Sequence, residues 1–498
     1  MKFSTKVSPN IRDREHKTTE IMGELSVGLL FIFAFSMVFY YQEYGFEYVL
    51  HGAGLMAISI ITALATETLY AAFMKKDIKY HIKNSFPLVT AIILTLTVQI
   101  NTSYFAIAVA TFFAIFFGKL VFGGFGHNIF NPAGVGRMII FSTLTGSTAA
   151  DVMTSATPIT SMADAGWIIK DSAVIEKFLE QFGGLWNLFI GWYPGAIGET
   201  STLLILIVCA YLGYRKVLDW KVPVVYIGSV FIFTTIIALT NGVGMWYPMF
   251  HILSGGLAFG AAFMATDPVT NPTTISGRII FAIGLGALTV LIRLKSNLPG
   301  GVIYALLIMN MVSPLLDKLT DDWSIYAVKK HTMAIGSALV MGIVITFFAG
   351  NGLEAKAVVF PTEEGEAEDI PVTLGDPVKI FSDSTADLPE ILEKTEEGSI
   401  VTYKLSVPGY AFVEHDGAPN MVLVKLNKET KTVESVLVTE ATDTPSLGSN
   451  VAAKTFVEQF KGISFDDTEA AVDAVSGATV SSKAIAKAVR VAILDLNK

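Results

Sequence analysis

The chain has 498 residues and a formal net charge of −9, and 52% of its residues are hydrophobic while only 16% are charged. Soluble domains carry about 25% charged residues, and the apolar residues here fall in runs of about 18 to 20, long enough for helices that cross a bilayer. We therefore expect a polytopic membrane protein rather than a soluble enzyme. The single cysteine, Cys209, excludes an intrachain disulfide and a cysteine-based metal cluster.

The charge is unevenly divided along the chain. Residues 351–498 hold 25 acidic and 13 basic residues, whereas the first 350 residues hold 19 and 22. The acidic last part has few long apolar runs, which indicates a separate water-soluble domain. Because a nucleic-acid-binding surface needs a basic face, we expect no nucleic-acid partner.

Eleven apolar segments follow a polar, basic N-terminal stretch, in which we expect no removable signal peptide. They are residues 23–41, 49–72, 86–100, 103–122, 134–148, 201–213, 222–240, 248–265, 278–294, 300–316 and 332–350. Three of them (86–100, 134–148 and 201–213) are shorter than a helix needs to span a bilayer. The fifth and sixth segments are joined by a long loop, residues 149–200.

Clusters of basic residues predict the orientation, because loops rich in Lys and Arg stay in the cytoplasm. Four clusters fall on one side of the eleven-segment pattern, at residues 12–17, 75–83, 215–221 and 329–330. Arg293 and Lys295 fall on the other side. We expect a cell (inner or cytoplasmic) membrane protein with its N-terminus in the cytoplasm. The 149–200 loop and the domain after residue 350 then lie outside.

Two loops of the membrane part resemble each other. The first, Phe122–Arg137, contains Asn131-Pro132, and the second, Phe263–Arg278, contains Asn271-Pro272. Each Asn-Pro pair is followed by Gly-Arg at nearly the same spacing, which indicates an internal repeat. Non-helical backbone at membrane depth persists only where protein or a cavity surrounds it, and paired broken segments indicate a central binding site. Two ordinary loops that share turn residues are the alternative.

Charged residues within or beside apolar runs are costly and often functional. They are Glu67, Lys119, Arg137, Glu199, Asp267 and Arg278. Glu67, Glu199 and Asp267 are candidates for a cation route, and the two arginines could hold anionic groups or tie the broken loops. Structural pairing between helices is the alternative for each of the six. His127 and His251 lack metal-ligand spacing, so we expect no metal site.

The part after residue 350 predicts a small α+β domain of ordinary size. A Glu-rich linker, residues 361–369, opens it. Alternating apolar and polar residues at 400–407 and 432–438 predict strands, and helical spacing predicts helices at 452–460 and 481–496.

A short run, Val475-Ser476-Gly477-Ala478-Thr479, precedes the last predicted helix. The free N–H groups and the positive dipole end of a helix N-terminus favour a phosphate group there. Gly477 and Ala478 would let a bulky ligand approach the backbone. A serine-rich helix cap without a ligand is the alternative.

Residues 473–482 resemble the flavin-attachment signature of the FMN-binding domain in the G subunit of Rnf complexes and in the C subunit of the sodium-pumping NADH:quinone oxidoreductase. Upstream, residues 442–448 resemble that family's Glu-Thr-Pro-Gly-Leu-Gly segment, with Asp443 in place of Glu and Ser446 in place of Gly. The resemblance implies that Thr479 is esterified to the phosphate of FMN. It also implies a flavin pocket lined by Ser476, Gly477, Ala478, Thr444, Pro445, Leu447 and Gly448.

Four stretches of the membrane part resemble the D subunit of Rnf complexes and the B subunit of the sodium pump. They are Phe122–Arg137, Leu185–Ser201, Phe263–Arg278 and Leu298–Asp317. Within this resemblance, Ser155-Ala156-Thr157-Pro158 is similar to the family's flavin-attachment segment, although the common glycine is absent. It implies a second covalent FMN on Thr157, beside Ser155. A polar external loop is the alternative.

The chain therefore resembles the D subunit (NqrB/RnfD family) fused to the G subunit (NqrC/RnfG family). The expected parts are a cytoplasmic segment at 1–20, a membrane domain at 21–320, an anchor helix at 331–350 and a soluble domain at 351–498. The expected fold class is a polytopic α-helical membrane protein with broken or re-entrant segments and an internal repeat. A small extracytoplasmic α+β FMN-binding domain follows. Fusion would raise the effective concentration of one flavin near the other.

The resemblance implies a subunit of a membrane-bound, ion-translocating electron transport complex of the Rnf type, a ferredoxin:NAD oxidoreductase. The subunit would carry two covalent FMN groups as threonine phosphoesters, with riboflavin as a further candidate, and relay electrons coupled to Na+ or H+ translocation. The implied partners are A-, B-, C- and E-like subunits, a separate FMN transferase and the lipid bilayer, and the chain is not expected to be catalytic alone. The alternatives are a solute transporter or channel with a flavin-binding sensory domain, and a structural anchor for other subunits.

Overall fold

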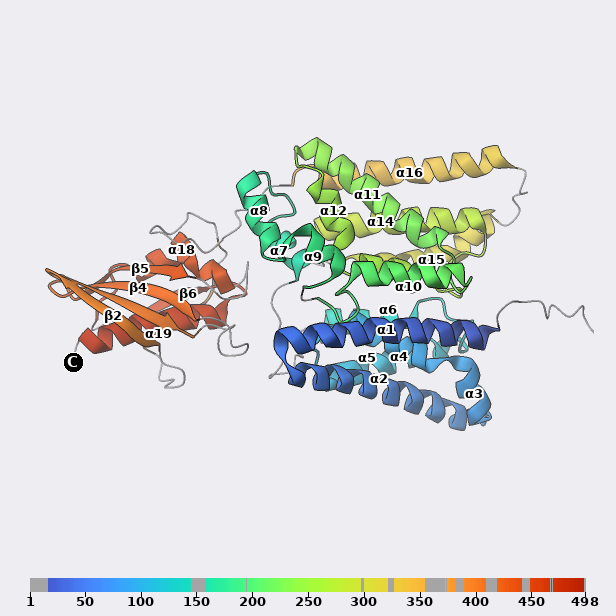
Figure 1. The fold of residues 1–498 in the computed structure, drawn as a ribbon, viewed down its shortest axis with the longest axis horizontal. Coiled ribbons are helices and arrows are strands. Elements are labelled where there is room, and N and C mark those ends of the chain that lie inside the picture. Colours follow the sequence, from blue (N-terminus) through green and yellow to red (C-terminus); the bar gives the residue numbers. More distant parts are fainter. Residues whose placement is uncertain are drawn as a thin grey trace, which may run out of the picture.

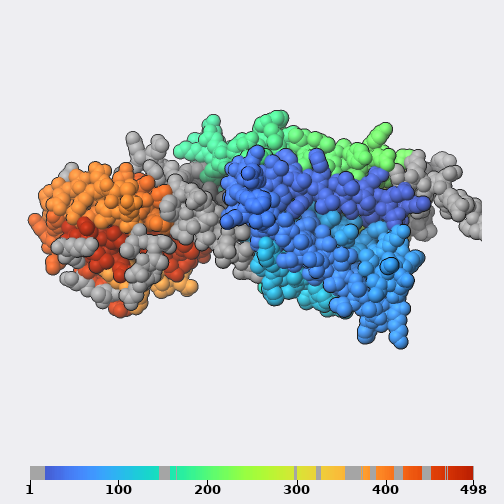
Figure 2. All heavy atoms as spheres, turned by 60° about the horizontal axis from the view of Figure 1, so that its bottom comes forward, coloured from blue at the N-terminus to red at the C-terminus, as the bar shows by residue number. Residues whose placement is uncertain are grey.

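The computed structural model contains a helix bundle and a smaller C-terminal domain (Figure 1). It describes residues 17–144, 157–193, 195–296, 300–320, 327–353, 372, 374–381, 389–408, 419–440, 448–465, 467 and 469–496. The buried apolar side chains form one large cluster within the helices and a second within the C-terminal domain. Figure 2 shows the orange and red C-terminal domain beyond one end of the blue and green helical part. The described residues therefore pack around two main hydrophobic cores.

Seven helices in the described part are long and apolar enough to cross a membrane. They are α1 (Thr18–Tyr44), α2 (Phe46–Phe73), α5 continued by a 3-10 turn (Tyr104–Phe122), α11 (Lys221–Asn241), α14 (Ile275–Lys295), α15 (Val302–Thr320) and α16 (Val328–Gly350). A helix of about 20 residues matches the hydrocarbon thickness of a bilayer. The prediction of a polytopic helical membrane protein is confirmed.

The other four predicted segments contain shorter or broken helices. They are α4 (Pro87–Thr97), α6 (Pro132–Thr143), α10 (Thr202–Tyr214), and the pair formed by α12 (Trp246–Leu253) with the stretch Leu257–Met264. That pair is bent by 61° at its break. The second arm consists of α13 (Leu257–Phe259) and a π-helical turn, η2 (Gly260–Met264). Gly255 lies in the break with a φ of +68°, a conformation that favours glycine. The broken or re-entrant segments are therefore present.

Each Asn-Pro loop is followed by a helix. Asn131 caps α6, because its side chain accepts the N–H of Gly134, and Pro132 occupies the first helical position. In the second loop the helix cap is Thr274 rather than the asparagine of the Asn-Pro pair. Thr274 lies two residues after Pro272, and its side chain accepts the N–H of Gly277 at the start of α14.

The bundle has two distinct ends. α3 (Ile78–Ser85) and the start of α1 lie at one end (Figure 1). The opposite end, nearer the C-terminal domain, carries three short helices that come from the predicted 149–200 loop. They are α7 (Pro158–Asp164), α8 (Ser172–Glu180) and α9 (Gly184–Ile190). That loop was predicted only as an external connection, so its helices are a difference from the sequence prediction.

The described residues of the C-terminal domain form two antiparallel sheets and one long helix. The larger sheet has the order β2 (Glu390–Glu397), β3 (Ile400–Val407), β4 (Asn420–Asn427) and β5 (Thr432–Glu440). The smaller pairs β1 (Leu374–Lys379) with β6 (Ala471–Val475). Helix α19 (Thr479–Leu496) packs on β3, β4 and β6, and the short turns η3 (Gly448–Ala452), α18 (Lys454–Val457) and η4 (Glu458–Phe460) complete the domain. The expected small α+β domain is confirmed.

Candidate functional sites

Thr157 begins a short helix at the end of the bundle nearer the C-terminal domain (Figure 1). It is the N-cap of α7: its Oγ1 accepts the N–H of Thr160 at 3.3 Å and lies 2.8 Å from Oγ1 of that residue. Pro158 suits the first helical position because its missing N–H would have no helical partner there. Thr157 is half-buried and lines a cavity, whereas Ser155 lies outside the described residues.

The empty space of this Thr157 cavity, together with the open solvent at its mouth, is about 760 Å³. Its walls include Phe141, Phe259, Met264 and Ile303, with the polar side chains of Gln99 and Tyr304 between them. Ligand sites of small molecules commonly have mostly apolar walls and a few polar groups. The chemistry of the cavity walls therefore suits a flat, largely apolar ligand with polar edges.

One wall of the Thr157 cavity is made of glycines. At Gly301, where φ is +59°, an added Cβ would lie 2.9 Å from the carbonyl oxygen of Thr289. At Gly256 it would lie 2.5 Å from Oε1 of Glu199. A larger residue would clash with these protein atoms, so both positions of the wall require glycine.

Arg137 and Glu199 bring opposite charges to the Thr157 cavity. The Arg137 side chain is only 8% exposed, and its guanidinium carbon lies 4.3 Å from the centre of the Phe141 ring. Within the described part of the chain, the guanidinium has neither a hydrogen bond nor an ion pair. The Glu199 carboxylate is close enough for the two opposite charges to attract each other. The buried guanidinium therefore has an opposite charge nearby but no direct partner among the described residues, so its N–H groups are available to a ligand in this cavity.

The corresponding arginine of the second loop has a different environment. Arg278 Nη1 lies 2.8 Å from Oδ2 of Asp219, and its Nε donates to the carbonyl oxygen of Pro272 at 2.8 Å. Both partners of this pair are partly exposed. Arg278 thus ties the second broken loop to the residues before α11, one of the two roles expected for it.

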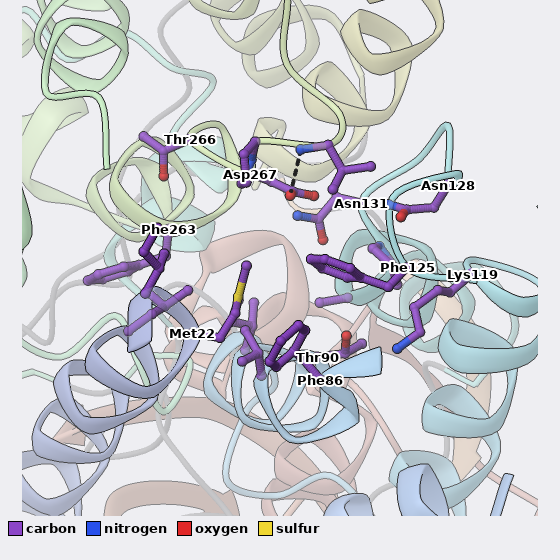
Figure 3. A pocket seen from close by; sticks show the side chains of 18 of the residues that line it. Met22, Phe86, Thr90, Lys119, Phe125, Asn128, Asn131, Phe263, Thr266 and Asp267 are labelled. Carbon is purple, nitrogen blue, oxygen red and sulfur yellow. Dashed lines mark hydrogen bonds between the residues drawn. The ribbon is translucent and has the colours of Figure 1, made fainter. Parts of the chain in front are cut away.

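A second cavity of about 740 Å³ lies at the opposite end, where α1 begins (Figure 3). Both broken loops line this Asp267 cavity, the first with Asn131 and the second with Asp267. The Asp267 carboxylate accepts the N–H of Val269 at 3.1 Å and the hydroxyl of Thr270 at 3.2 Å. These bonds fix the turn and leave the carboxylate at the cavity wall. The two look-alike loops therefore meet at one site, as their pairing predicts.

Three elements pass from one cavity to the other. Helix α4 contributes Thr90 to the Asp267 cavity and Thr97 to the Thr157 cavity. Helix α6 contributes Asn131 to the first and Arg137 to the second, and the arm α13–η2 contributes Phe263 to the first and Phe259 and Met264 to the second. The π-helical turn η2 therefore lines both cavities, with Phe263 in the first and Met264 in the second. Such π-turns are frequent at functional sites.

Glu67 is enclosed in a network of hydrogen bonds. Its carboxylate lies 2.6 Å from Nζ of Lys119, and it accepts hydrogen bonds from Ser85 at 2.5 Å and from Nε2 of His81 at 2.6 Å. Lys119 also donates to the carbonyl oxygen of Ser85 at 2.7 Å. Glu67 is fully buried and joins α2, α3 and the segment after α5. These contacts resemble structural pairing between helices, while Lys119 also lines the Asp267 cavity.

Arg293 is a feature that the sequence pattern did not identify as important. It is fully buried in α14, and its guanidinium donates to the carbonyl oxygens of His251 at 2.7 Å and Ser254 at 3.3 Å. These carbonyls end α12 at the helix break, where a cation complements the negative end of the helix dipole. The position of Arg293 on the wrong side of the charge pattern was the available signal, because a buried arginine does not count as a loop charge.

In the C-terminal domain, Thr479 is the exposed first residue of α19. β6 ends at Val475, and a turn with Gly477 at φ +81° leads into the helix. The turn is held by Ser482, whose Oγ accepts the N–H of Val475 at 3.0 Å and donates to the carbonyl oxygen of Ala478 at 2.9 Å. The predicted run is therefore a strand–turn–helix element that presents Thr479 at a helix N-terminus.

Of the predicted pocket residues at 444–448, the structure describes only Gly448. Gly448 begins η3, which packs against α19, while Thr444, Pro445 and Leu447 lie outside the described residues. Ser476 and Gly477 are exposed beside Thr479, and Ala478 is buried. Among the described residues, no group of three His, Cys, Asp or Glu side chains could hold a metal ion.

Comparisons with known proteins agree with this two-part organisation. Residues 4–325 match the NQR2, RnfD, RnfE family, and residues 417–494 match the FMN-binding domain. One relative is the D subunit of the proton-translocating ferredoxin:NAD(+) oxidoreductase complex of Clostridium ljungdahlii. The two chains are 38% identical over 333 residues, which cover 64% of this chain and 95% of that protein.

Two further relatives extend the comparison. The D subunit of the Na(+)-translocating ferredoxin:NAD(+) oxidoreductase complex of Acetobacterium woodii is 34% identical over 330 residues, which cover 65% of this chain and 95% of that protein. The B subunit of the Na(+)-translocating NADH-quinone reductase of Chromohalobacter salexigens is 35% identical over 243 residues, covering 46% and 56%. The chain therefore belongs to the NQR2, RnfD, RnfE family and joins that family's membrane part to an FMN-binding domain.

Proposed function

We propose that this chain is a redox subunit of an ion-translocating electron transport complex of the Rnf type, with FMN esterified to Thr157 and to Thr479. The observation that carries the proposal is the fusion itself, since a membrane part of the NQR2, RnfD, RnfE family and an FMN-binding domain occupy one chain. FMN supplies electron transfer when it is bound, and the protein holds it, orients it and sets its potential.

The geometry at Thr479 supports a phosphoester. The hydroxyl is exposed at the N-terminus of an 18-residue helix, whose free N–H groups and dipole stabilise the charge of a phosphate. Gly477 and Ala478 leave the backbone before it open to a large ligand. No activating base is needed on this chain, because we propose that a separate FMN transferase forms both esters.

The geometry at Thr157 supports a second phosphoester. This residue lines a cavity with aromatic and glycine walls, the wall chemistry that suits a flat isoalloxazine ring. Arg137 provides a cation in the same cavity. These residues fit FMN. We also keep riboflavin as a candidate for a further cofactor of the complex.

An ion route through the membrane part is supported by the two cavities. Glu199 lines the cavity at one end and Asp267 the cavity at the other, and α4, α6 and the α13–η2 arm contribute residues to both cavities. We propose that both carboxylates bind the coupling ion in turn. Glu67 remains a weaker candidate, since its oxygens are occupied by Lys119, Ser85 and His81.

The coupling ion is Na+ or H+, and the relatives' names include both. We propose A-, B-, C- and E-like subunits as partners, and a cell membrane location with residues 1–20 in the cytoplasm. The proposed anchor helix 331–350 then carries the domain 351–498 outside. This agrees with the positions of Thr157 and the C-terminal domain at the end opposite the start of α1 (Figure 1).

Flavin fluorescence on denaturing gels tests the proposal. The full chain, expressed with an FMN transferase, should give a fluorescent band that persists after boiling in detergent. Thr157→Val and Thr479→Val should each remove about half of the signal, and the double variant all of it. A transporter with a single sensory flavin would lose the whole signal with Thr479→Val alone, and a non-fluorescent wild-type chain would exclude covalent FMN.

A further inference from the structure

We propose that the guanidinium of Arg137 contacts the isoalloxazine ring of the flavin on Thr157 and raises its reduction potential. This rests on the proposed attachment at Thr157. The first observation is that Arg137 lines the same cavity as Thr157 while its side chain is only 8% exposed. In the described part of the chain Arg137 has no hydrogen bond or direct ion pair, and Glu199 attracts it only from a longer distance, so its N–H groups remain available to a ligand.

The repeat provides an internal comparison. Gly136-Arg137 and Gly277-Arg278 stand at equivalent places after the two Asn-Pro pairs. Arg278 is satisfied by Asp219 and by the carbonyl of Pro272, whereas Arg137 has no such partner among the described residues. An arginine used only to fix a loop would be expected to resemble Arg278. Arg137 instead has its guanidinium against the Phe141 ring, which holds it in place without neutralising it.

The depth of Arg137 favours the ring over the phosphate. Helix α6 runs from Asn131 at the Asp267 cavity to Arg137 and Phe141 at the Thr157 cavity, and it ends at Thr143. Arg137 is six residues before that end, which places it about 9 Å further into the bundle at 1.5 Å per residue. The phosphoester must remain beside the Thr157 hydroxyl, so the deeper group meets the distal part of the ligand. The surrounding wall of aromatic and glycine residues also matches a flat ring.

The consequence is electrostatic. The oxidised ring is neutral, and uptake of two electrons and one proton from a low-potential donor leaves the reduced ring with one negative charge. A fixed positive charge at contact distance in a site shielded from water stabilises the reduced form more than the oxidised form. Arg137 therefore raises the potential of this flavin, while the nearby Glu199 opposes it.

A redox titration of a variant that carries only the Thr157 flavin tests the proposed contact of Arg137. In a Thr479→Val background, the full chain carries covalent flavin only on Thr157, and its midpoint potential is read from flavin absorbance. Arg137→Gln should lower the potential, by about 30 mV for each tenfold loss in stability of the reduced form in a two-electron couple. Arg137→Lys keeps the positive charge, so its midpoint potential should stay close to that of the Thr479→Val parent. The matched control Arg278→Gln should leave the midpoint potential unchanged. Arg137→Met gives the same test if the Arg137→Gln protein is not expressed in sufficient amount.

The outcomes separate this inference from the proposed function. A retained Thr157 flavin with an unchanged potential in Arg137→Gln and Arg137→Met would overturn the ring contact alone. Loss of the fluorescent band in these variants, with the band kept in Arg278→Gln, would assign Arg137 to the phosphate and also overturn the ring contact. A Thr479→Val parent without any covalent flavin would overturn both the attachment and the contact.

Discussion

The side chain of Asn310 joins the two broken loops by a bond to each. The backbone N–H of Asn131 donates to Oδ1 of Asn310 at 3.0 Å, and Nδ2 of Asn310 donates to the carbonyl oxygen of Thr270 at 3.3 Å. Asn310 is 1% exposed on α15, so both bonds are shielded from water. One amide thus satisfies a donor of the first loop and an acceptor of the second, where neither loop has a helical partner.

Removal of this amide should destabilise the whole membrane part. Asn310→Ala leaves a buried N–H and a buried carbonyl unpaired, each at a cost of about 1–3 kcal/mol. We expect a clear fall in the unfolding temperature of the detergent-solubilised chain, measured by loss of monodisperse protein on heating. Asn84→Ala is the control, because exposed Asn84 bonds only the carbonyl of Tyr80 within its own helix among the described contacts. Equal stability of the two variants would contradict the linking role.

The Glu67–Lys119 pair should show strong coupling in stability. Glu67→Gln or Lys119→Met alone leaves one charge buried without its partner, which typically costs about 3–5 kcal/mol. The double variant removes both charges and should cost less than the sum of the two single changes, by about 0.5–3 kcal/mol. A double-mutant cycle of thermal or denaturant unfolding in detergent measures this difference. Additive effects would mean that the ion pair is not the reason for burying these two groups.

The sequence predicts the C-terminal domain well because its patterns are local. The alternation at 400–407 coincides with β3, since every second side chain there faces the core. The helix predicted at 481–496 begins two residues earlier in the structure, which makes Thr479 its first residue. Helix ends are uncertain by this much because the capping residues have no apolar periodicity.

The membrane part is predicted less completely, because apolar composition does not show where a helix breaks. The segment 248–265 reads as one span, yet it bends by 61° at a break that contains Gly255. The contrast between Arg137 and Arg278 is also invisible, since Asp219 is far from Arg278 in sequence. From the sequence, Arg293 resembles a loop charge on the wrong side of the membrane. In the structure its buried guanidinium donates to the carbonyl oxygens at the end of α12. These features depend on tertiary contacts.

Neutralising a carboxylate in either cavity should slow ion movement while the flavins remain attached. Asp267→Asn and Glu199→Gln each remove one charged oxygen ligand, worth about 1.5–3 kcal/mol to a cation, so ion uptake should fall by at least about tenfold. The measurement is electron-driven ion uptake into vesicles that contain the assembled complex, with gel fluorescence as the check on flavin content. Exposed Glu47→Gln is the control. Uptake at the wild-type rate in both variants would exclude this route.

Ser482 should control flavin attachment at Thr479 through the turn that precedes it. Its hydroxyl satisfies the N–H of Val475 and the carbonyl of Ala478, which lie on either side of Gly477. Ser482→Ala removes both bonds in a buried position, so the turn should lose about 1–3 kcal/mol of stability. We expect less FMN on Thr479, measured as fluorescence per chain in a Thr157→Val background. Ser435→Ala on β5 is the matched control, and Ser482→Thr should restore part of the signal because it keeps the hydroxyl. If Ser482→Ala attaches FMN as fully as Ser435→Ala, then the exposed N-terminus of α19 alone is enough for attachment, and the turn has only a structural role.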